Sequence, residues 1–106
     1  MIEGKIVKIR FNKYFPEQRL WIFIGKVLKF TDNWVTVEGR GIITVKGDLP
    51  AHIDEEPRLL MIPRENIAHI RILPDTFDLS EIKVETRGFR QYIKVKGGPD
   101  TSIGEL

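Results

Sequence analysis

The stretch at residues 20–30, LWIFIGKVLKF, decides the fold of this chain. It is long enough for a helix, but aromatic and β-branched residues dominate it, and these side chains favour a pleated strand. Its first half is apolar at successive positions, which predicts a strand buried on one face by the core and on the other by a partner subunit or chain segment. Gly25 stands in its middle, where a missing side chain favours a sharp bend.

Strands with alternating side chains extend outward from this stretch in both directions. Before it, residues 4–11 place Val7 and Ile9 on one face and charged side chains on the other. After it, Thr31, Asp32 and Asn33 supply the chemistry of a tight turn, since Asp and Asn bond their own backbone. Further strands are predicted at residues 34–46, 59–62 and 67–73, the first of them broken or bent by the glycines at positions 39–41. A solvated loop is predicted at 47–58 and a short turn at 63–66.

The chain changes character after Pro74. Residues 75–80 form a turn-rich connector, and the segments 82–86 and 91–96 predict a hairpin, followed by a frayed tail from Gly97. The sequence therefore predicts an all-β fold with very little helix. Five of the predicted strands lie in residues 1–73, and residues 74–106 are expected to form a C-terminal β-hairpin extension of the same domain.

Composition excludes several classes of site. The 106 residues include no cysteine, which rules out disulfides, thiolate zinc sites and cysteine nucleophiles. No apolar run approaches the roughly 20 residues that span a bilayer, and the amino terminus lacks the apolar segment of a signal peptide. These features predict a cytoplasmic protein, and the small size favours self-assembly as a way to bury further apolar surface.

Charge is distributed unevenly along the chain. Residues 1–29 carry seven Lys and Arg against two Glu, residues 30–81 carry five against ten acids, and residues 82–98 carry five against one. Basic ends of this kind would suit a polyanionic partner, although a mixed, solvated surface is the more ordinary interpretation.

Two segments resemble signatures of the Sm-like (LSm) family. Residues 25–33, GKVLKFTDN, are similar to its Gly-x-Leu-x-x-Phe-Asp run, and residues 61–67, MIPRENI, are similar to its Ile-Arg-Gly-Asn-Asn-Ile run. With the predicted strand order, the resemblance covers residues 4–73. Aligned on the flanking isoleucines, Pro63 stands where the family has Arg, and Arg64 where it has Gly. The chain thus resembles a divergent member with an extra C-terminal hairpin.

The resemblance implies that residues 1–73 form a strongly bent, five-stranded open barrel. Its edge strands would pair with those of neighbouring subunits to close a ring, with RNA bound near the pore. The expected function is a non-catalytic homo-oligomeric ring that binds RNA or another single-stranded polyanion and needs no cofactor. The alternative is a structural scaffold built from the same oligomer, which docks a protein partner and does not bind nucleic acid.

The candidate RNA-binding residues come from the two turns of these signatures: Asp32, Asn33, Trp34, Arg64, Glu65 and Asn66. Trp34 offers a face on which a base could stack, while Arg64 and Asn66 could stack on or bond the edges of bases. The alternatives are that Trp34 caps the end of the barrel, and that Arg64 and Glu65 form a surface pair in an ordinary turn.

A second candidate patch is the basic side of the final hairpin: Lys83, Arg87, Arg90, Lys94 and Lys96. These cations, interleaved with Phe89 and Tyr92, could follow a phosphate backbone, or they could face water while the hairpin covers an edge or open end of the barrel.

Residues 52–56 contain the only cluster of metal-ligand types, one His and three acids, but without the spacing or supporting shell of a metal site. We therefore predict no metal. Without a nucleophile near a His, or a glycine-rich phosphate loop before a helix, we predict no enzyme.

Overall fold

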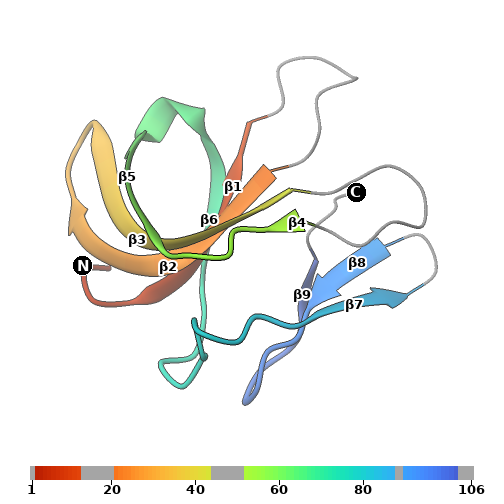
Figure 1. Cartoon of the computed structure of the whole chain (residues 1–106). Coiled ribbons are helices and arrows are strands. Elements are labelled where there is room, and N and C mark those ends of the chain that lie inside the picture. Colours follow the sequence, from red (N-terminus) through yellow and green to blue (C-terminus); the bar gives the residue numbers. More distant parts are fainter. Residues whose placement is uncertain (1, 13–20, 44–51, 88–89, 103–106) are drawn as a thin grey trace.

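The computed structural model describes residues 2–12, 21–43, 52–87 and 90–102, and excludes the side chains of Arg90 and Ser102. Within these ranges the chain forms two antiparallel sheets and one 3-10 turn, with no α-helix (Figure 1). The prediction of an all-β fold is confirmed. None of the described residues belongs to a helix that could cross a membrane.

The larger sheet contains six strands in the order β4-β3-β2-β1-β6, with β5 also paired to β3. Its elements are β1 (Ile6–Phe11), β2 (Trp21–Phe30), β3 (Trp34–Ile43), β4 (His52–Ile53), β5 (Arg58–Pro63), the 3-10 turn η1 (Arg64–Asn66) and β6 (Ile67–Ile72). The smaller sheet, here called the C-terminal sheet, contains β7 (Val84–Arg87), β8 (Arg90–Ile93) and β9 (Thr101–Ser102).

The long strands β2 and β3 approach most closely at a pair of glycines. Gly25 lies directly opposite Gly39, and a Cβ atom on Gly39 would stand 2.7 Å from the carbonyl carbon of Ile24. Side chains are therefore excluded from both positions by the neighbouring backbone. The glycines at 39–41 do not break β3, which runs without interruption, because β2 pairs with it on both sides of Gly39.

One face of the larger sheet, here called its inner face, encloses a hydrophobic core. Alternate residues of the strands supply its buried members: Val7, Ile9, Phe23, Val27, Val35, Val37 and Ile62. The alternation seen in the sequence places these side chains together, since residues two apart on a strand share a face.

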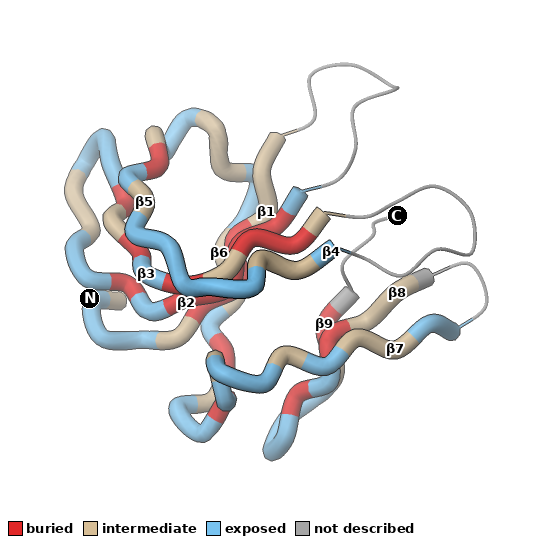
Figure 2. The backbone as a smooth tube through the Cα atoms, in the orientation of Figure 1, coloured by how far each residue is buried: buried red, intermediate tan, exposed pale blue. Residues whose placement is uncertain are grey.

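The opposite face, here called the outer face, is covered in part by the C-terminal sheet (Figure 2). The buried residues of this second core are Ile22, Ile24, Ile42, Leu73, Phe77, Ile93 and Val95. The first half of β2 is thus buried on both faces, and the cover on its outer face is a segment of the same chain. The sequence allowed either a partner subunit or a segment of the same chain on this face, and the structure shows the second.

Two expectations about irregular segments were wrong. His52 and Ile53, placed in a solvated loop, form β4 by pairing with Ile43 and Ile42. Thr101, placed in a frayed tail, is buried in β9, where its hydroxyl oxygen accepts a 2.7 Å hydrogen bond from Nζ of Lys8. Lys8 lies on β1, so this bond ties the C-terminal sheet to the larger one. The predicted tail residues 103–106 lie outside the described residues.

Candidate nucleic-acid interface

The turn between β2 and β3 and the turn η1 meet at one end of the larger sheet. Trp34 pairs with Pro63 in the ladder between β3 and β5, and the backbone N–H of Arg64 donates a 2.9 Å hydrogen bond to the carbonyl of Asn33. A shallow hollow of about 300 Å³ lies between the turns. Its lining, here called the turn site, is Asp32, Asn33, Trp34, Pro63, Arg64 and Glu65.

Five of the six candidate RNA-binding residues therefore converge, although about 30 positions separate the two signatures in the sequence. Asn66 does not line the hollow. Its carbonyl accepts a 2.8 Å hydrogen bond from the N–H of Asn12, whose side-chain amide in turn donates to the carbonyl of Glu65 at 2.9 Å. Asn12 thus fixes η1 to the end of β1.

Arg64 holds the two turns together. Its Nη1 donates to the carbonyls of Thr31 and Asp32, at 3.1 and 3.2 Å, and its guanidinium lies 4.5 Å from the centre of the Phe30 ring. Charge-assisted hydrogen bonds and a cation–π contact are stronger than neutral contacts. Arg64 and Glu65 are both described and exposed, and no ion pair joins them, so the structure does not show the surface pair that was the alternative interpretation.

Trp34 is held by its backbone and leaves its ring in solvent. Its N–H lies 3.1 Å from Oγ1 of Thr31, and its carbonyl accepts a 2.9 Å bond from the N–H of Thr31. The residue is 43% exposed, so it does not cap the core as a buried side chain would. A fixed backbone with an exposed indole suits stacking on a planar ligand, because little freedom is lost on binding.

Sequence reasoning missed two residues that shape the turn site. Phe30 supplies the ring on which Arg64 lies, and Thr31 supplies the hydroxyl that fixes Trp34. Both lie in residues 25–33, whose pattern predicted the strand and the turn but not these contacts. The role of Phe30 depends on Arg64, which is more than 30 positions away, whereas the bond between Thr31 and Trp34 is local.

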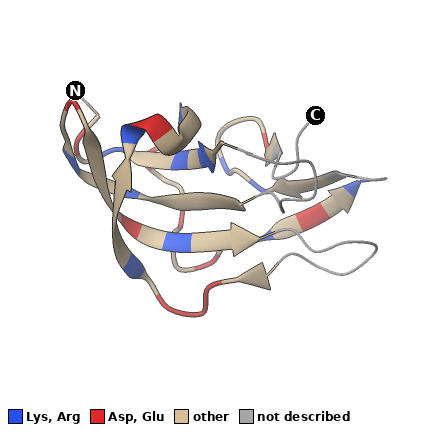
Figure 3. Ribbon diagram, turned by 90° about the horizontal axis from the view of Figure 1, so that it is seen from above, with Lys and Arg blue, Asp and Glu red and all other residues tan. Residues whose placement is uncertain are grey.

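Acidic and basic residues are interspersed along the strands (Figure 3), and at the C-terminal sheet several of them form ion pairs. Nη2 of Arg87 pairs with Glu85 at 3.0 Å and also with Asp100, and Lys94 pairs with the same two carboxylates at 3.0 and 3.5 Å. Lys83 pairs with Glu81 at 3.4 Å. Three of the five predicted cations thus carry an acidic partner.

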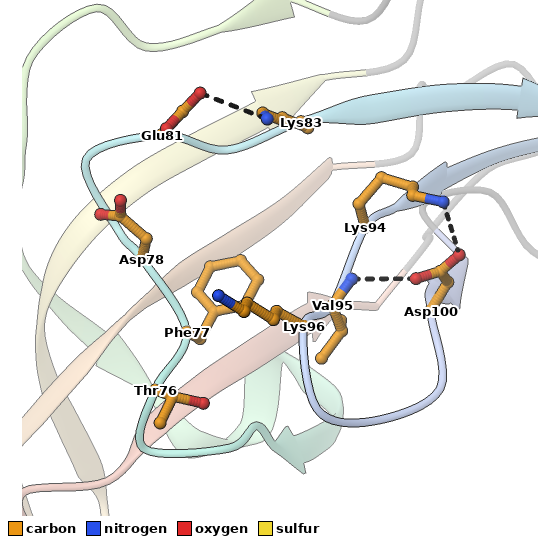
Figure 4. A pocket seen from close by; sticks show the side chains of 9 residues that line it. All are labelled: Thr76, Phe77, Asp78, Glu81, Lys83, Lys94, Val95, Lys96 and Asp100. Carbon is orange, nitrogen blue, oxygen red and sulfur yellow. Dashed lines mark hydrogen bonds and ion pairs between the residues drawn. The ribbon is translucent and has the colours of Figure 1, made fainter.

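A hollow of about 600 Å³ lies between this sheet and the connector before it (Figure 4). Lys83, Lys94 and Lys96 line it together with Asp78, Glu81 and Asp100. Equal numbers of cations and carboxylates give no net attraction for an anion. The arrangement therefore favours the covering role of the hairpin over a path for phosphates.

The shared carboxylates have lowered pKa values. The pKa of Asp100 falls below its ordinary value of 3.8 because its carboxylate accepts hydrogen bonds from the N–H of Val95 and from Arg87. The pKa of Glu85 falls below 4.5 because Arg87 and Lys94 donate to it. Glu85 in turn raises the pKa of Lys94. These interactions stabilise the charged forms of Glu85, Lys94 and Asp100 in the C-terminal sheet and in the turn before β9.

We expect Asp100→Asn to flatten the dependence of melting temperature on pH. The folded-state pKa of Asp100 is lowered, so its stabilising effect is complete above the ordinary value of 3.8 and is lost as pH falls through the lower, folded value. Thermal unfolding at about pH 7 and about pH 3 should show a smaller difference for the variant than for the parent chain. Asp75→Asn, which alters an exposed carboxylate outside this network, is the control. Equal pH dependence in D100N and the parent would contradict the prediction.

No group of three or more potential metal ligands occurs among the described residues, which include the whole of 52–56. Asp54 has a structural role, since its Oδ2 accepts a 3.0 Å hydrogen bond from the N–H of Gly41 and lies 3.4 Å from Nε of Arg58.

Comparison with known protein families, curated proteins and solved structures gives no match to this chain. Inferences about its function therefore depend on its own geometry.

Proposed function

We propose that this chain is a non-catalytic, Sm-like protein that assembles into a homo-oligomeric ring and binds single-stranded RNA at the turn site. The observation that carries the proposal is the strand order. β5 and β6, which are consecutive in the chain and joined by η1, lie on opposite sides of the β3-β2-β1 core of the sheet. This order, together with the close packing of β2 against β3 at Gly25 and Gly39, supports a five-stranded open barrel of the Sm-like type.

The unpaired edges of β5 and β6 support the assembly. In the described part of the chain β5 pairs only with β3, and β6 only with β1. Each strand therefore keeps one row of backbone donors and acceptors for another partner. Pairing β5 of one copy with β6 of the next satisfies both rows, and a repeated head-to-tail contact of this kind closes into a ring when the rotation permits.

The turn site supports the choice of RNA as ligand. Single-stranded RNA is bound mainly by stacking its bases on aromatic rings and guanidinium planes and by bonding their edges. Trp34 supplies an exposed ring, Arg64 a fixed guanidinium plane and Asn33 an exposed amide within one hollow. In a ring each copy would present one such site, and this repeated arrangement suits a single-stranded RNA of repetitive sequence.

A protein-docking scaffold is the second candidate, favoured by the state of the cations. Arg64 already contacts two carbonyls, and Arg87, Lys94 and Lys83 are paired with acids. Such a surface would attract phosphates weakly. The scaffold predicts the same ring without affinity for nucleic acid.

We expect Trp34→Ala to weaken binding of a single-stranded RNA about 5- to 150-fold, the range that corresponds to roughly 1–3 kcal/mol per stacked base. The matched control is Trp21→Ala. Trp21 is 42% exposed, close to the 43% of Trp34, but it stacks on Phe11 instead of lining the turn site. Fluorescence anisotropy with labelled U-rich and A-rich RNA, at about 50 mM salt, measures the effect.

Native mass spectrometry of the same samples gives the number of copies and any co-purified nucleic acid. Equal affinity in W34A and the parent would exclude the turn site. An oligomer that binds no RNA at low salt would favour the scaffold, and a monomer would contradict both candidates.

A further inference from the structure

The outer face of the larger sheet is covered over only part of its extent, and the rest exposes three large apolar side chains. The C-terminal sheet covers Ile22, Ile24 and Ile42. The exposed side chains, here called the outer apolar patch, are Leu28 (48%), Leu59 (63%) and Met61 (61%).

The three residues lie on one face of adjacent strands. Leu60 and Ile62 pack against the inner core, so their neighbours Leu59 and Met61 point to the outer face. Met61 is opposite Thr36 on β3, and Thr36 is opposite Lys29 on β2, next to the bulge that contains Leu28. A contiguous group of exposed apolar side chains is typical of a surface that binds another molecule.

The patch borders the unpaired edge of β5, and the other unpaired edge has an apolar side chain of its own. Ile72 of β6 is 52% exposed, although it shares the inner face with Val7, its partner on β1. Among the described residues, β5 and β6 thus each have one edge without a paired strand, and exposed apolar groups lie beside both edges. Because every copy of the chain carries both edges, the β5 edge of one copy can pair with the β6 edge of the next. An unrelated partner would not have to offer an edge that matches either one.

The outer face beside β6 is occupied by the turn that precedes β9. Arg71 of β6 lies opposite Lys8, and its Nη2 donates a 2.7 Å hydrogen bond to the carbonyl of Pro99. Its Nη1 also lies 3.4 Å from the carbonyl of Asp100. These bonds hold the exposed segment 97–99 over the outer side of the edge strand.

We infer that the outer apolar patch of one copy docks against residues 97–100 of the next copy. The inference rests on the proposed pairing of β5 with β6. Paired strands lie about 4.8 Å apart and keep the same face of the sheet, so the outer side chains Leu59 and Met61 come to lie beside the neighbour's Arg71 and the turn that it holds. The C-terminal sheet thereby covers its own larger sheet and part of the neighbouring one.

The absence of cysteine from the chain permits a direct test by cross-linking. The double variant Met61→Cys/Pro99→Cys, treated with a short bismaleimide, should give a ladder of covalent multimers on a denaturing gel. Leu59→Cys/Pro99→Cys is a second pair, since Leu59 lies two residues away on the same face. Lys26→Cys/Pro99→Cys is the control, because Lys26 is exposed on β2, away from both free edges.

Native mass spectrometry of the uncross-linked variants separates the outcomes. A ladder from either test pair and none from the control supports the inference. An intact oligomer in which neither test pair gives a ladder overturns the inference and leaves the ring proposal standing. A monomer of the parent chain overturns the ring proposal and the docking together.

Discussion

Deletion of residues 74–106 is expected to abolish the cooperative folded state of this chain. The deletion removes Phe77, Ile93 and Val95 from the second core, on the outer face of the larger sheet. It exposes the members of that core that remain on β2 and β3. Burial of one large apolar side chain contributes about 1.5–3 kcal/mol, so three of them supply an amount similar to the 5–15 kcal/mol net stability of a typical domain. Circular dichroism and thermal unfolding of the truncated chain measure the loss.

A point substitution tests the same contact in the full chain. Ile93→Ala should lower the free energy of unfolding by about 2–5 kcal/mol, since Ile93 is fully buried between the two sheets. Lys96→Ala, on an exposed position of the same extension, should change it by less than about 0.5 kcal/mol. A truncated chain that unfolds cooperatively at the temperature of the full chain would show that the larger sheet is stable alone.

Gly39→Ala is expected to destabilise the chain by about 3 kcal/mol or more, at or above the upper end of the range for overpacking a core. The new Cβ would meet backbone atoms of Ile24 and Gly25, with the carbonyl carbon of Ile24 at 2.7 Å. Backbone in a paired ladder cannot move aside without breaking hydrogen bonds on both strands. Urea unfolding measures the change.

Gly98→Ala is the matched control for this substitution. A Cβ on Gly98 would come no closer than 3.4 Å to any atom, and the nearest is a side-chain carbon of Pro74. The effect should be close to zero or slightly stabilising, because alanine restricts the unfolded chain. Equal effects at the two positions would mean that the close approach of β2 and β3 does not limit Gly39.

The sequence predicted the longer strands because each is encoded by its own residues, but it did not predict the two-residue strands β4 and β9. The apolar positions in residues 4–11 and 20–30 predicted β1 and β2. Gly25 was expected to mark a bend, and the structure shows that the backbone of β3 leaves no room for a side chain there. The turn residues at 31–33 and 63–66 predicted both halves of the turn site. The candidates Trp34 and Arg64 do line one hollow, although their role in binding RNA is still a prediction.

Contacts between distant segments were not predictable in the same way. Nothing near Arg64 indicates that its guanidinium would hold the carbonyls of Thr31 and Asp32, and nothing near Thr101 indicates that Lys8 would bond it. The basic spacing of the final hairpin suggested a patch for phosphates. The structure brings Asp100 to Arg87 and Lys94, so these two charges, which looked free in the sequence, are paired.

The sequence by itself determined that this chain is all-β and which side chains avoid water, because alternation along a strand is a local property. The first half of residues 20–30 thus required a cover on both faces. Only the tertiary structure decided that the second cover is the chain's own C-terminal sheet, since apolar surface is attracted to any apolar surface and specifies no particular partner. That choice depends on the shapes, registers and long-range bonds that exist only once the strands are assembled.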